Sequence, residues 1–437
     1  MNSIWTENIK LPQFESLKGD LKTDVLIIGG GMAGILCASF LQEQGIDYAL
    51  AEGRTICAGV TKNTTAKITS QHGLIYHKLL KGAGLEKAKM YLQANQDALE
   101  KYAKLCQEID CDFEAKTSYV YSKDNRRKLE KEAEALHQIG FEARIYETDE
   151  LPFPTAGAIG FENQAQFHPL KFISKIARNL KIYEHTFVKE LSENTAVTPD
   201  GKIHFQRLIF ATHFPIDNKH GMYFLKMYQR RSYVIALENA AKINGMYVDE
   251  AKDGMSFRNY GDYLLVGGGG HRTGKQGGGW QELRSFAGKY FPASSEKYYW
   301  ATQDCMTLDK VPYIGRYAKR MPECYVAAGF NKWGMTSSMT AAMILADLVM
   351  GKENPYAEVF EPSRGIMKPQ LLCNGCESVV NLLSISKKRC PHLGCALKWN
   401  CEEHSWDCPC HGSRFDEAGI LLDNPANGNL NDRKTIP

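Results

Sequence analysis

Two short stretches that contain cysteine and histidine stand close together near the C-terminal end of the sequence. The first, C-P-H-L-G-C, begins at Cys390, and the second, C-P-C-H-G-S, begins at Cys408. Thiolate sulfur and imidazole nitrogen are ligands of zinc and of iron–sulfur clusters. Because each stretch carries both types of ligand at short spacing, the sequence predicts one metal centre that is bound by two loops.

These stretches resemble the two cluster-binding loops of Rieske proteins, C-x-H-x-x-C and C-x-C-H-G-S. In a Rieske [2Fe–2S] centre, one iron has two cysteine ligands and the other has two histidine ligands. The resemblance also implies that Cys395 and Cys410 match a pair that is disulfide-bonded in many Rieske proteins. It further implies that Ser413 can hydrogen-bond the cluster and raise its potential. The metal ligands that it implies are Cys390, His392, Cys408 and His411.

The same region leaves other interpretations open. Cysteine and histidine also bind structural zinc tetrahedrally, and a loop pair without metal is a further alternative. Only about 25 residues separate Arg364 from Cys390, so the strands that support the loops in a full Rieske domain are expected to be shortened or rebuilt. Cys373 and Cys376 lie in this stretch. They could form a redox pair or half of a metal site, but we prefer the interpretation that they are two small residues packed inside a minimal module.

A glycine-rich turn near the N-terminus predicts a dinucleotide-binding unit. It runs from Gly29 to Gly34 in the pattern G-x-G-x-x-G, between a predicted strand over 24–28 and a predicted helix over 35–44. The first glycine allows a tight turn, the second lets a pyrophosphate approach the backbone, and the third lets the helix pack on the strand. Glu52, which ends a second strand, can bind a ribose hydroxyl. This pattern alone does not distinguish FAD from NAD(P).

The order of motifs in the chain resembles the FAD-dependent D-amino acid oxidase/glycine oxidase superfamily over about residues 20–352. The further matching segments are 59–67, 167–170, Val188, 210–212, 309–315 and 329–336. In that family, the last segment brings backbone amides and a helix N-terminus to the pyrimidine end of the flavin, where they favour the negative charge of the reduced form. The cofactor-binding residues that the resemblance implies are Gly29, Gly31, Met32, Ala33, Gly34, Glu52, Gly53, Arg54, Gly59, Thr61, Thr65, Ala66, Lys67, Val188, Ala211, Thr212, Gly315, Gly329, Gly334, Met335 and Thr336.

One segment departs from the pattern of the family. Where its usual oxidases often have Gly-Ala-Ser after the acid, this chain has G-V-T from Gly59, followed by a T-T-A-K run that ends at Lys67. Lys67 is expected either near the flavin or, equally, in solvent. For His72 and His77, on the following helix, a structural role is favoured over a catalytic one. No catalytic residue is therefore assigned from the sequence.

The motifs together predict an α/β protein with three parts. The first is an FAD-binding Rossmann-like domain of the glutathione-reductase type, the second an α+β substrate domain, and the third a small C-terminal all-β Rieske-like module. The oxidoreductase part is expected over 1–352, with FAD-binding pieces at about 20–85, 155–214 and 301–352, the substrate domain at about 86–154 and 215–300, a linker at 353–372 and the Rieske [2Fe–2S] module at 373–437.

The combination resembles bacterial FAD-dependent oxidoreductases with a C-terminal Rieske domain. A flavin accepts two electrons as a hydride, whereas a Rieske cluster carries one electron at a time. We therefore expect a small-molecule amine or amino acid to be dehydrogenated at its C–N bond and a one-electron acceptor, a protein or a small carrier, to receive the electrons. Since arginine binds carboxylates bidentately, the residues considered for holding a substrate carboxylate are Arg230, Arg231, Tyr233, Arg258 and Tyr260.

Two other functions stay open at this point. The first is electron transfer without an amine substrate, in which a pyridine nucleotide or a ferredoxin exchanges electrons with the flavin. Against it, the glycine run from Gly267 follows a strand but precedes no helical pattern, so a second dinucleotide-binding unit is not predicted. The other is a flavoprotein with a structural zinc site.

Composition narrows the class of protein further. The net charge of +3 is too small to predict a nucleic-acid or membrane partner. No apolar run reaches the roughly 18 residues that a membrane span needs, and the first residues lack the pattern of a signal peptide. We therefore expect a cytoplasmic protein, in which clustered cysteines favour metal binding over a disulfide scaffold.

Overall fold

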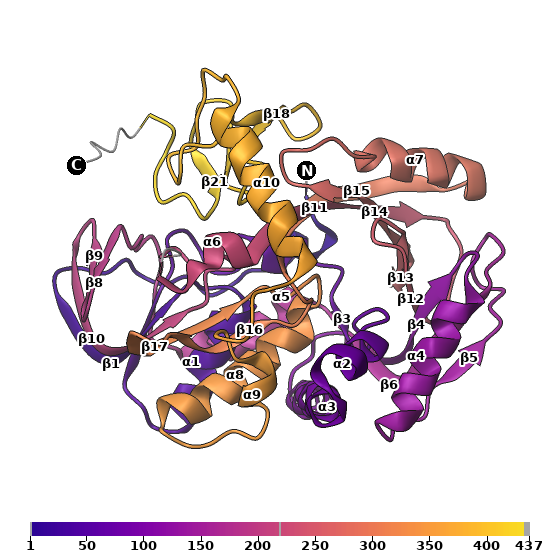
Figure 1. Cartoon of the computed structure of the whole chain (residues 1–437), viewed down its shortest axis with the longest axis horizontal. Helices are drawn as coiled ribbons and strands as arrows, with labels where there is room; N and C mark the ends of the chain where they lie inside the picture. The colour runs from indigo at the N-terminus through magenta and orange to yellow at the C-terminus, as the bar shows by residue number, and fades with distance from the viewer. Residues whose placement is uncertain (1, 218–219, 432–437) are drawn as a thin grey trace.

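The computed structural model describes residues 2–217 and 220–431 of the chain. Figure 1 shows two large sheets with helices packed around them, and the C-terminal part, in yellow, at one side of both. None of the helices in the described ranges is long and apolar enough to cross a membrane.

The first sheet is mainly parallel and is built on a buried central strand. In spatial order its strands are β16 (Tyr313–Ala318), β17 (Met321–Ala328), β10 (Gly201–Phe210), β1 (Leu21–Ile28), β2 (Tyr48–Ala51) and β7 (Ile182–Tyr183), with β9 (Thr195–Thr198) paired to β10 and β8 (Glu190–Ser192) paired to β9. The apolar end of β1 is buried on both faces, as is usual in a parallel sheet. The glycine-rich turn follows and leads into helix α1 (Met32–Glu43). The predicted strand, turn, helix and second strand are thus confirmed.

The second sheet is mainly antiparallel and forms the floor of the expected substrate domain. In spatial order its strands are β15 (Ser295–Thr307), β11 (Met227–Glu238), β14 (Tyr263–Arg272), β13 (Ser256–Tyr260), β12 (Met246–Asp249), β4 (Glu114–Ser122), β6 (Gly157–Gln166) and β3 (Lys67–Ile68), with β5 (Arg144–Tyr146) beside β6. Both β3 and β6 come from stretches that the sequence assigned to the FAD-binding pieces. The second sheet therefore includes strands from outside the predicted substrate domain.

Helices cover the outer faces of both sheets. Helix α8 (Gly334–Val349) packs on α1 and on the long helix α3 (Leu85–Cys106). This contact places the last part of the oxidoreductase region beside the first. The remaining helices and short 3-10 helices are η1 (Ile4–Thr6), η2 (Val60–Asn63), α2 (Tyr76–Ala83), α4 (Arg126–Gln138), α5 (Pro169–Ile176), η3 (Ala177–Asn179), η4 (His220–Met222), α6 (Tyr223–Lys226), α7 (Gly279–Tyr290) and α9 (Ala357–Phe360).

The C-terminal part contains a small sheet and one helix. The sheet has β18 (Lys398–Asn400), β19 (Ser405–Asp407), β20 (Arg414–Phe415) and β21 (Leu421–Asp423), and the helix is α10 (Pro369–Leu383). The short strands agree with the predicted β module, and α10 occupies the stretch in which a rebuilt support was expected. The segment before α10 is not a loose linker, because Phe360 is buried and Arg364 forms an ion pair with Asp309 at 2.8 Å.

Candidate functional site

The turn between β1 and α1 forms a cradle of backbone amides. Gly29 has a φ of +110°, and a Cβ there would lie 2.6 Å from the carbonyl oxygen of Ala211. A Cβ on Gly34 would overlap the carbonyl oxygen of Gly29, so glycine is required for β1, α1 and the end of β10 to come this close. Helix α1 begins at Met32 after Gly31, and its first amides and dipole suit the diphosphate of a dinucleotide. The cradle therefore fits FAD.

Two side chains complete the cradle. Glu52 Oε2 accepts a hydrogen bond from the Gly30 amide at 2.7 Å, and Oε1 accepts one from the Arg54 amide at 2.8 Å. Thr61 Oγ1 accepts one from the Met32 amide at 3.0 Å. The Glu52 carboxylate is thereby fixed at the end of β2, where the sequence predicted a ribose partner.

The cradle opens into a cavity of about 2400 Å³ that extends to the C-terminal loops. A site for one small ligand commonly has roughly 300–1,000 Å³, so this volume suits a dinucleotide together with a substrate. The cavity wall also includes segments 389–394 and 421–430 of the C-terminal part, and Asn424 of the second segment donates to the Thr212 carbonyl beside the cradle at 2.7 Å. Cys390 and His392 lie in that wall, so the two cofactor sites predicted from the sequence open onto the same cavity.

Most of the predicted FAD-contacting residues lie in the cavity wall. These are Gly29, Gly31, Met32, Ala33, Glu52, Gly53, Arg54, Gly59, Thr61, Thr65, Lys67, Val188, Ala211, Thr212, Gly334 and Met335. The others, which lie behind the wall, are Gly34, Ala66, Gly315, Gly329 and Thr336. Gly315 is the one farthest from expectation: a Cβ there would meet Pro362 at 3.1 Å, so its role in the structure is to let β16 pack on the segment before α10.

The turn that precedes α8 has an unusual backbone. Asn331 and Lys332 have φ angles of +53° and +76°, which side chains other than glycine rarely adopt. The Asn331 side chain holds this turn by accepting a hydrogen bond from the Thr307 amide at 2.9 Å and donating one to the Thr307 hydroxyl at 3.1 Å. The turn brings Lys332 and Trp333 to the cavity at the N-terminus of α8, and amide donors from this segment to the pyrimidine end of a flavin stay a prediction.

Lys67 and His72 are buried titratable groups in the cavity wall. Burial and the nearby Arg258 guanidinium lower the pKa of Lys67 to about 7. Burial lowers the pKa of His72 to about 3, and its ring lies 2.6 Å from the Tyr91 hydroxyl. Lys67 is therefore not a solvated surface lysine, and His72 is neutral at pH 7. His77 also reaches the cavity wall.

Two of the five residues considered for carboxylate binding line the cavity, namely Arg230 and Tyr233. Arg230 forms an ion pair with Asp253, and within the described residues its buried Nε has no hydrogen-bond partner. Arg231 does not face the cavity and forms an ion pair with Glu403 instead.

Arg258 and Tyr260 are also turned away from the cavity, contrary to the expectation for both. Arg258 Nη1 donates to the carbonyl oxygens of Thr65 and Ala66 at 2.8 Å each, so it braces the loop beneath the cradle. The Tyr260 hydroxyl donates to Asp112 at 2.6 Å. Both side chains are thus held by segments that lead into β3 and β4, strands of the same sheet.

A group of cations in the cavity wall was missed from the sequence, because its members belong to no motif. Burial, and then the charges of Lys78, Lys252, Lys332 and Arg230, lower the pKa of Lys310 to about 8. All five side chains line the cavity. Asp253 and Asp304, which also line the cavity, offset part of this charge. The repulsion that remains among the five cations is relieved when an anion binds among them, so this part of the cavity favours an anionic ligand.

The cysteines and histidines of the two C-terminal loops come together as predicted. The Cys390 and Cys408 thiols are buried and in contact, which raises the pKa of Cys390 and lowers that of Cys408. The rings of His392 and His411 lie 5.0 Å apart between centroids. Both ring nitrogens of His411 are buried, and neither has a hydrogen-bond partner among the described residues. Two thiols and two imidazoles at the tips of two loops fit a Rieske [2Fe–2S] cluster.

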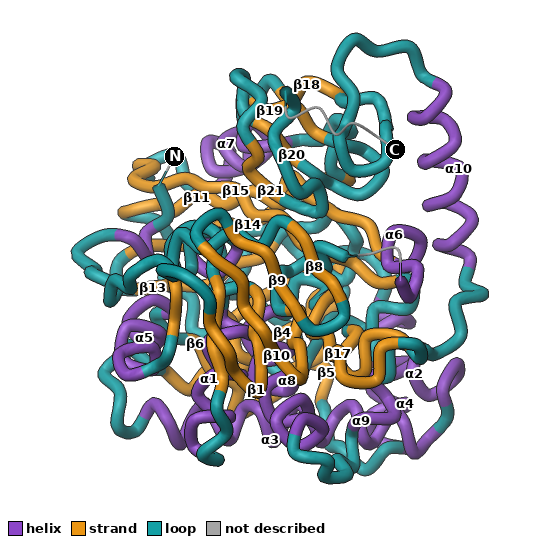
Figure 2. The backbone as a smooth tube through the Cα atoms, turned by 90° about the vertical axis from the view of Figure 1, so that its left-hand side faces the viewer, coloured by secondary structure: helices purple, strands orange, loops and turns teal. Residues whose placement is uncertain are grey.

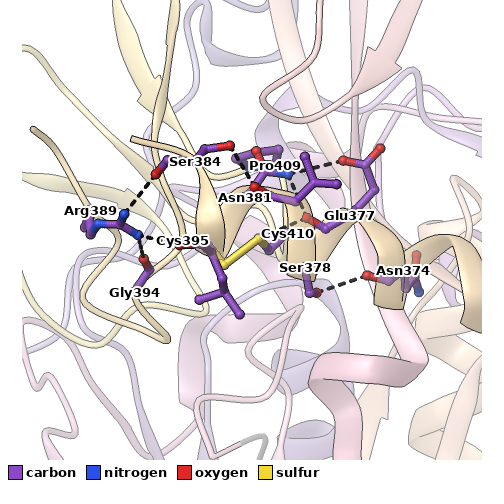
Figure 3. Close-up of a disulfide and its surroundings, with 12 residues drawn as sticks. Asn374, Glu377, Ser378, Asn381, Ser384, Arg389, Gly394, Cys395, Pro409 and Cys410 are labelled. Carbon is purple, nitrogen blue, oxygen red and sulfur yellow. Dashed lines mark hydrogen bonds between the residues drawn. A yellow bond between two sulfur atoms is a disulfide. The ribbon is translucent and has the colours of Figure 1, made fainter. Parts of the chain in front are cut away.

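Cys395 and Cys410 form a disulfide beside this donor set (Figure 3). The Cys408 sulfur lies within 4.8 Å of both, but the disulfide leaves Cys408 as the thiol ligand of its loop. Cys373 and Cys376 are exposed on α10, so the prediction that they pack inside a minimal module is wrong. They are also separate from the donor set.

Side chains of the second sheet hold the second cluster loop through its main chain. Gln229, Gln303 and Arg272 donate to carbonyl oxygens of residues 409–412 at 2.8–3.1 Å. These three residues belong to no recognisable motif, so sequence reasoning missed them. These hydrogen bonds fix the main chain of the loop and leave its ligand side chains free to bind the cluster.

A buried ion pair joins the same two parts of the chain. The Arg231 guanidinium binds Glu403, which also accepts a hydrogen bond from Arg414 at 2.9 Å. The side chains of Arg231 and Glu403 are each 3% exposed. Burial raises the pKa of Glu403, but the two guanidinium charges outweigh it and lower the pKa to about 2. Glu403 is therefore ionised throughout the neutral range.

Comparison with known proteins agrees with this division of the chain. A family model described as FAD dependent oxidoreductase matches residues 24–348, and one described as Rieske [2Fe-2S] domain matches residues 378–434. The Bacillus subtilis (strain 168) protein YhfW, which is named as a putative Rieske 2Fe-2S iron-sulfur protein, is 33% identical over 97% of this chain and 96% of its own length.

Solved structures share the fold of the larger part. Glycine oxidase from Geobacillus kaustophilus superimposes with a TM-score of 0.67 at 19% identity, over 79% of this chain and 100% of its own. L-proline dehydrogenase from P. horikoshii superimposes with a TM-score of 0.66 at 18% identity, over 80% of this chain and 98% of its own.

Proposed function

Because the chain belongs to the FAD dependent oxidoreductase family and carries a Rieske [2Fe–2S] domain, we propose that it dehydrogenates the C–N bond of an amino acid or another amine. In this proposal the electrons pass from FAD through the cluster to a one-electron acceptor. A bound flavin takes two electrons as a hydride and a Rieske cluster carries one at a time, so the pair converts a two-electron oxidation into single-electron steps.

The observation that carries the proposal is the shared cavity. Its wall contains the amide cradle of α1 and also Cys390 and His392. The loop hydrogen bonds from Gln229 and Gln303 keep the cluster-binding loop in the same place relative to that cavity. Fixed placement supports direct electron transfer inside one chain.

The charge of the cavity supports an amino acid as the substrate. The cation group around Lys310 attracts a carboxylate, and Arg230 offers it a guanidinium. The same positive potential disfavours an ammonium group, so it favours the neutral amine from which a hydride can leave. Glycine oxidase and L-proline dehydrogenase, which share the fold, are named for amino-acid substrates.

Anaerobic mixing of the holoprotein with a panel of amines and of L- and D-amino acids tests the proposal. We expect an amino acid to bleach the flavin band and then to generate the EPR signal of a reduced Rieske cluster. In the Cys408→Ser variant the flavin should still bleach, without the cluster signal. If no amine or amino acid bleaches the flavin, the substrate class is wrong. If the flavin bleaches while the cluster of the wild-type protein stays oxidised, the electron route is wrong.

The cellular location of this reaction, which we expect to be the cytoplasm, stays a prediction.

A further inference from the structure

Helix α10 has its polar face turned inward, the reverse of an ordinary surface helix. Asn374 and Asn381 are 2% and 3% exposed. The Asn374 side chain donates to the Leu225 carbonyl at 3.1 Å and accepts from Arg272 at 3.1 Å. Figure 3 shows the disulfide beside the turn of α10 that contains Glu377 and Ser378. The inward face of α10 is thus satisfied by hydrogen bonds rather than by apolar packing.

The outward face of α10 is apolar and exposed. We call this face the α10 stripe; its members are Leu372, Cys376, Val379, Val380, Leu383 and the following Ile385. Leu372 and Leu383 are 74% and 78% exposed, and Ile385 is fully exposed. The helical members are three or four residues apart and so form one continuous surface. Figure 2 shows α10 along the outer edge of the molecule. A contiguous exposed apolar surface of this kind marks an interaction site.

Basic residues flank the stripe at both ends. Lys368 precedes α10, and Lys387, Lys388 and Arg389 follow it. Between Pro362 and Cys401 the sequence contains a single acidic residue. That residue, Glu377, forms an ion pair with Lys275 at 2.9 Å and is not part of the stripe. The small net charge of the whole chain conceals this local concentration of positive charge.

We propose that the α10 stripe docks the protein on an anionic lipid bilayer. An apolar helix face flanked by lysine and arginine binds such a surface, because the aliphatic side chains enter the acyl boundary and the cations meet anionic headgroups. The apolar members of the stripe do not line the substrate cavity, although Arg389 beyond its end does, and the docking does not depend on which substrate is oxidised.

The composition of the stripe argues against two other occupants. A second copy of α10, parallel or antiparallel, would bring basic ends against basic ends. Protein interfaces concentrate their binding energy in tryptophan, tyrosine and arginine, with leucine and valine under-represented, whereas the stripe is made of leucine, valine, isoleucine and cysteine. A bilayer satisfies both its aliphatic character and its positive flanks.

Docking through α10 also places the cluster-binding loops near the membrane surface. The Cys410 sulfur lies 4.0 Å from the main-chain oxygen of Glu377 on the inward side of α10. The stripe lies on the opposite side of the same helix, and a helix with its side chains is about 10 Å across. The second cluster loop is therefore separated from the docked surface by little more than α10 itself.

Vesicle flotation of the full-length holoprotein tests the proposal. Vesicles of equal parts phosphatidylglycerol and phosphatidylcholine should bind the wild-type protein, and binding should weaken as salt screens the headgroups. The Val379→Gln/Leu383→Gln double variant should bind about a hundredfold more weakly, because burial of each aliphatic side chain in the acyl boundary is worth about 1.5 kcal/mol or more. Ile420→Gln, at an exposed residue outside the stripe, is the matched control and should bind as the wild type does.

A charge variant separates lipid from protein partners. Lys368→Glu/Lys387→Glu should lower binding to the anionic vesicles by roughly tenfold, with Lys319→Glu as the control. All variants should retain the visible spectra of both cofactors, which shows that they are folded. The proposal is overturned if the wild-type protein does not float, or if the stripe variant floats as well as it does. It is also overturned if sedimentation shows a dimer that the stripe variant loses, or if the variant slows electron transfer to an acidic ferredoxin without vesicles.

Discussion

Glu403 lies in a buried ion pair between the C-terminal module and the second sheet, and its replacement by glutamine should loosen that contact. Its pKa is lowered from an ordinary 4.5 to about 2, and each pKa unit is worth about 1.4 kcal/mol, so the ionised carboxylate contributes about 3 kcal/mol. Removal of one partner of a buried pair typically costs about 3–5 kcal/mol, which is consistent with this value. Glu403→Gln leaves the Arg231 charge buried without its partner.

The pH dependence follows from the direction of this shift. Since the folded-state pKa lies below the unfolded one, the stabilisation is fully present above pH 4.5 and is lost as the pH falls through about 2. Urea unfolding of the holoprotein at pH 7, followed by the visible circular dichroism of the cluster and by flavin fluorescence, measures the effect. With a slope of about 1–3 kcal/mol per molar urea, the cluster transition should move to about 1–3 M lower urea.

Glu402→Gln, at the exposed neighbouring carboxylate, is the matched control and should leave the cluster transition in place. A loss of less than about 0.5 kcal/mol in Glu403→Gln, which is usual for a surface substitution, would refute the reasoning. At pH 3 the stabilisation from the ionised Glu403 carboxylate is already much reduced. The reasoning would also be refuted if the wild type and the variant differed in unfolding free energy as much at pH 3 as at pH 7.

Three further substitutions test the two cofactor sites and the cation group. Gly34→Ala should yield protein without flavin, because the new Cβ would overlap the Gly29 carbonyl. Gly82→Ala, the control, has open space around it and should keep the flavin absorbance. A normal flavin content in Gly34→Ala would contradict the proposal that this turn binds FAD. Cys408→Ser should lose iron and the EPR signal but retain flavin, and full iron content would rule Cys408 out as a ligand. Arg230→Met should weaken the binding of an amino acid substrate by about 10- to 100-fold, since a hydrogen bond to a charged group contributes about 1.5–3 kcal/mol. If the concentration of amino acid needed to reduce the flavin in an anaerobic titration is unchanged, Arg230 does not bind the carboxylate.

Local patterns were sufficient to predict the two cofactor sites. The glycine turn from Gly29 and the ligand loops at Cys390 and Cys408 are set by backbone clearance and ligand chemistry, which are encoded within a few neighbouring residues. Their strand and loop settings in the structure agree with the prediction. Most of the residues that the family resemblance implied for FAD binding then lie in the cavity wall, although they make up only a small part of that wall.

The direction of single side chains in the second sheet was not predictable from the sequence. Arg230 and Arg231 are adjacent, so in a strand they point to opposite faces, and only the assembled fold shows which one meets the cavity. Arg258 had the right chemistry for a carboxylate but braces the loop at Thr65 instead. The cation group around Lys310 is assembled from distant segments, for which the sequence holds no periodic signal.

The C-terminal module differs most from expectation. The sequence indicated that its supporting strands were rebuilt, and the structure shows α10 in that place with Asn374 and Asn381 facing inward. The apolar and polar positions of α10 have ordinary helical spacing, so the sequence does not show that its polar face is the one turned inward. Only the position of the rest of the protein reveals which face is covered.

The main-chain contacts to residues 409–412 have a consequence for redesign of the redox centre. Because Gln229, Gln303 and Arg272 hold carbonyl oxygens, a ligand in this loop can be exchanged while these hydrogen bonds are kept. Histidine ligands give Rieske centres potentials of about −150 to +300 mV, against about −400 mV for plant-type ferredoxins with four cysteines. Replacement of His411 by cysteine, within this loop, would thus lower the potential of the centre toward the ferredoxin range while the hydrogen bonds that hold the loop are unchanged.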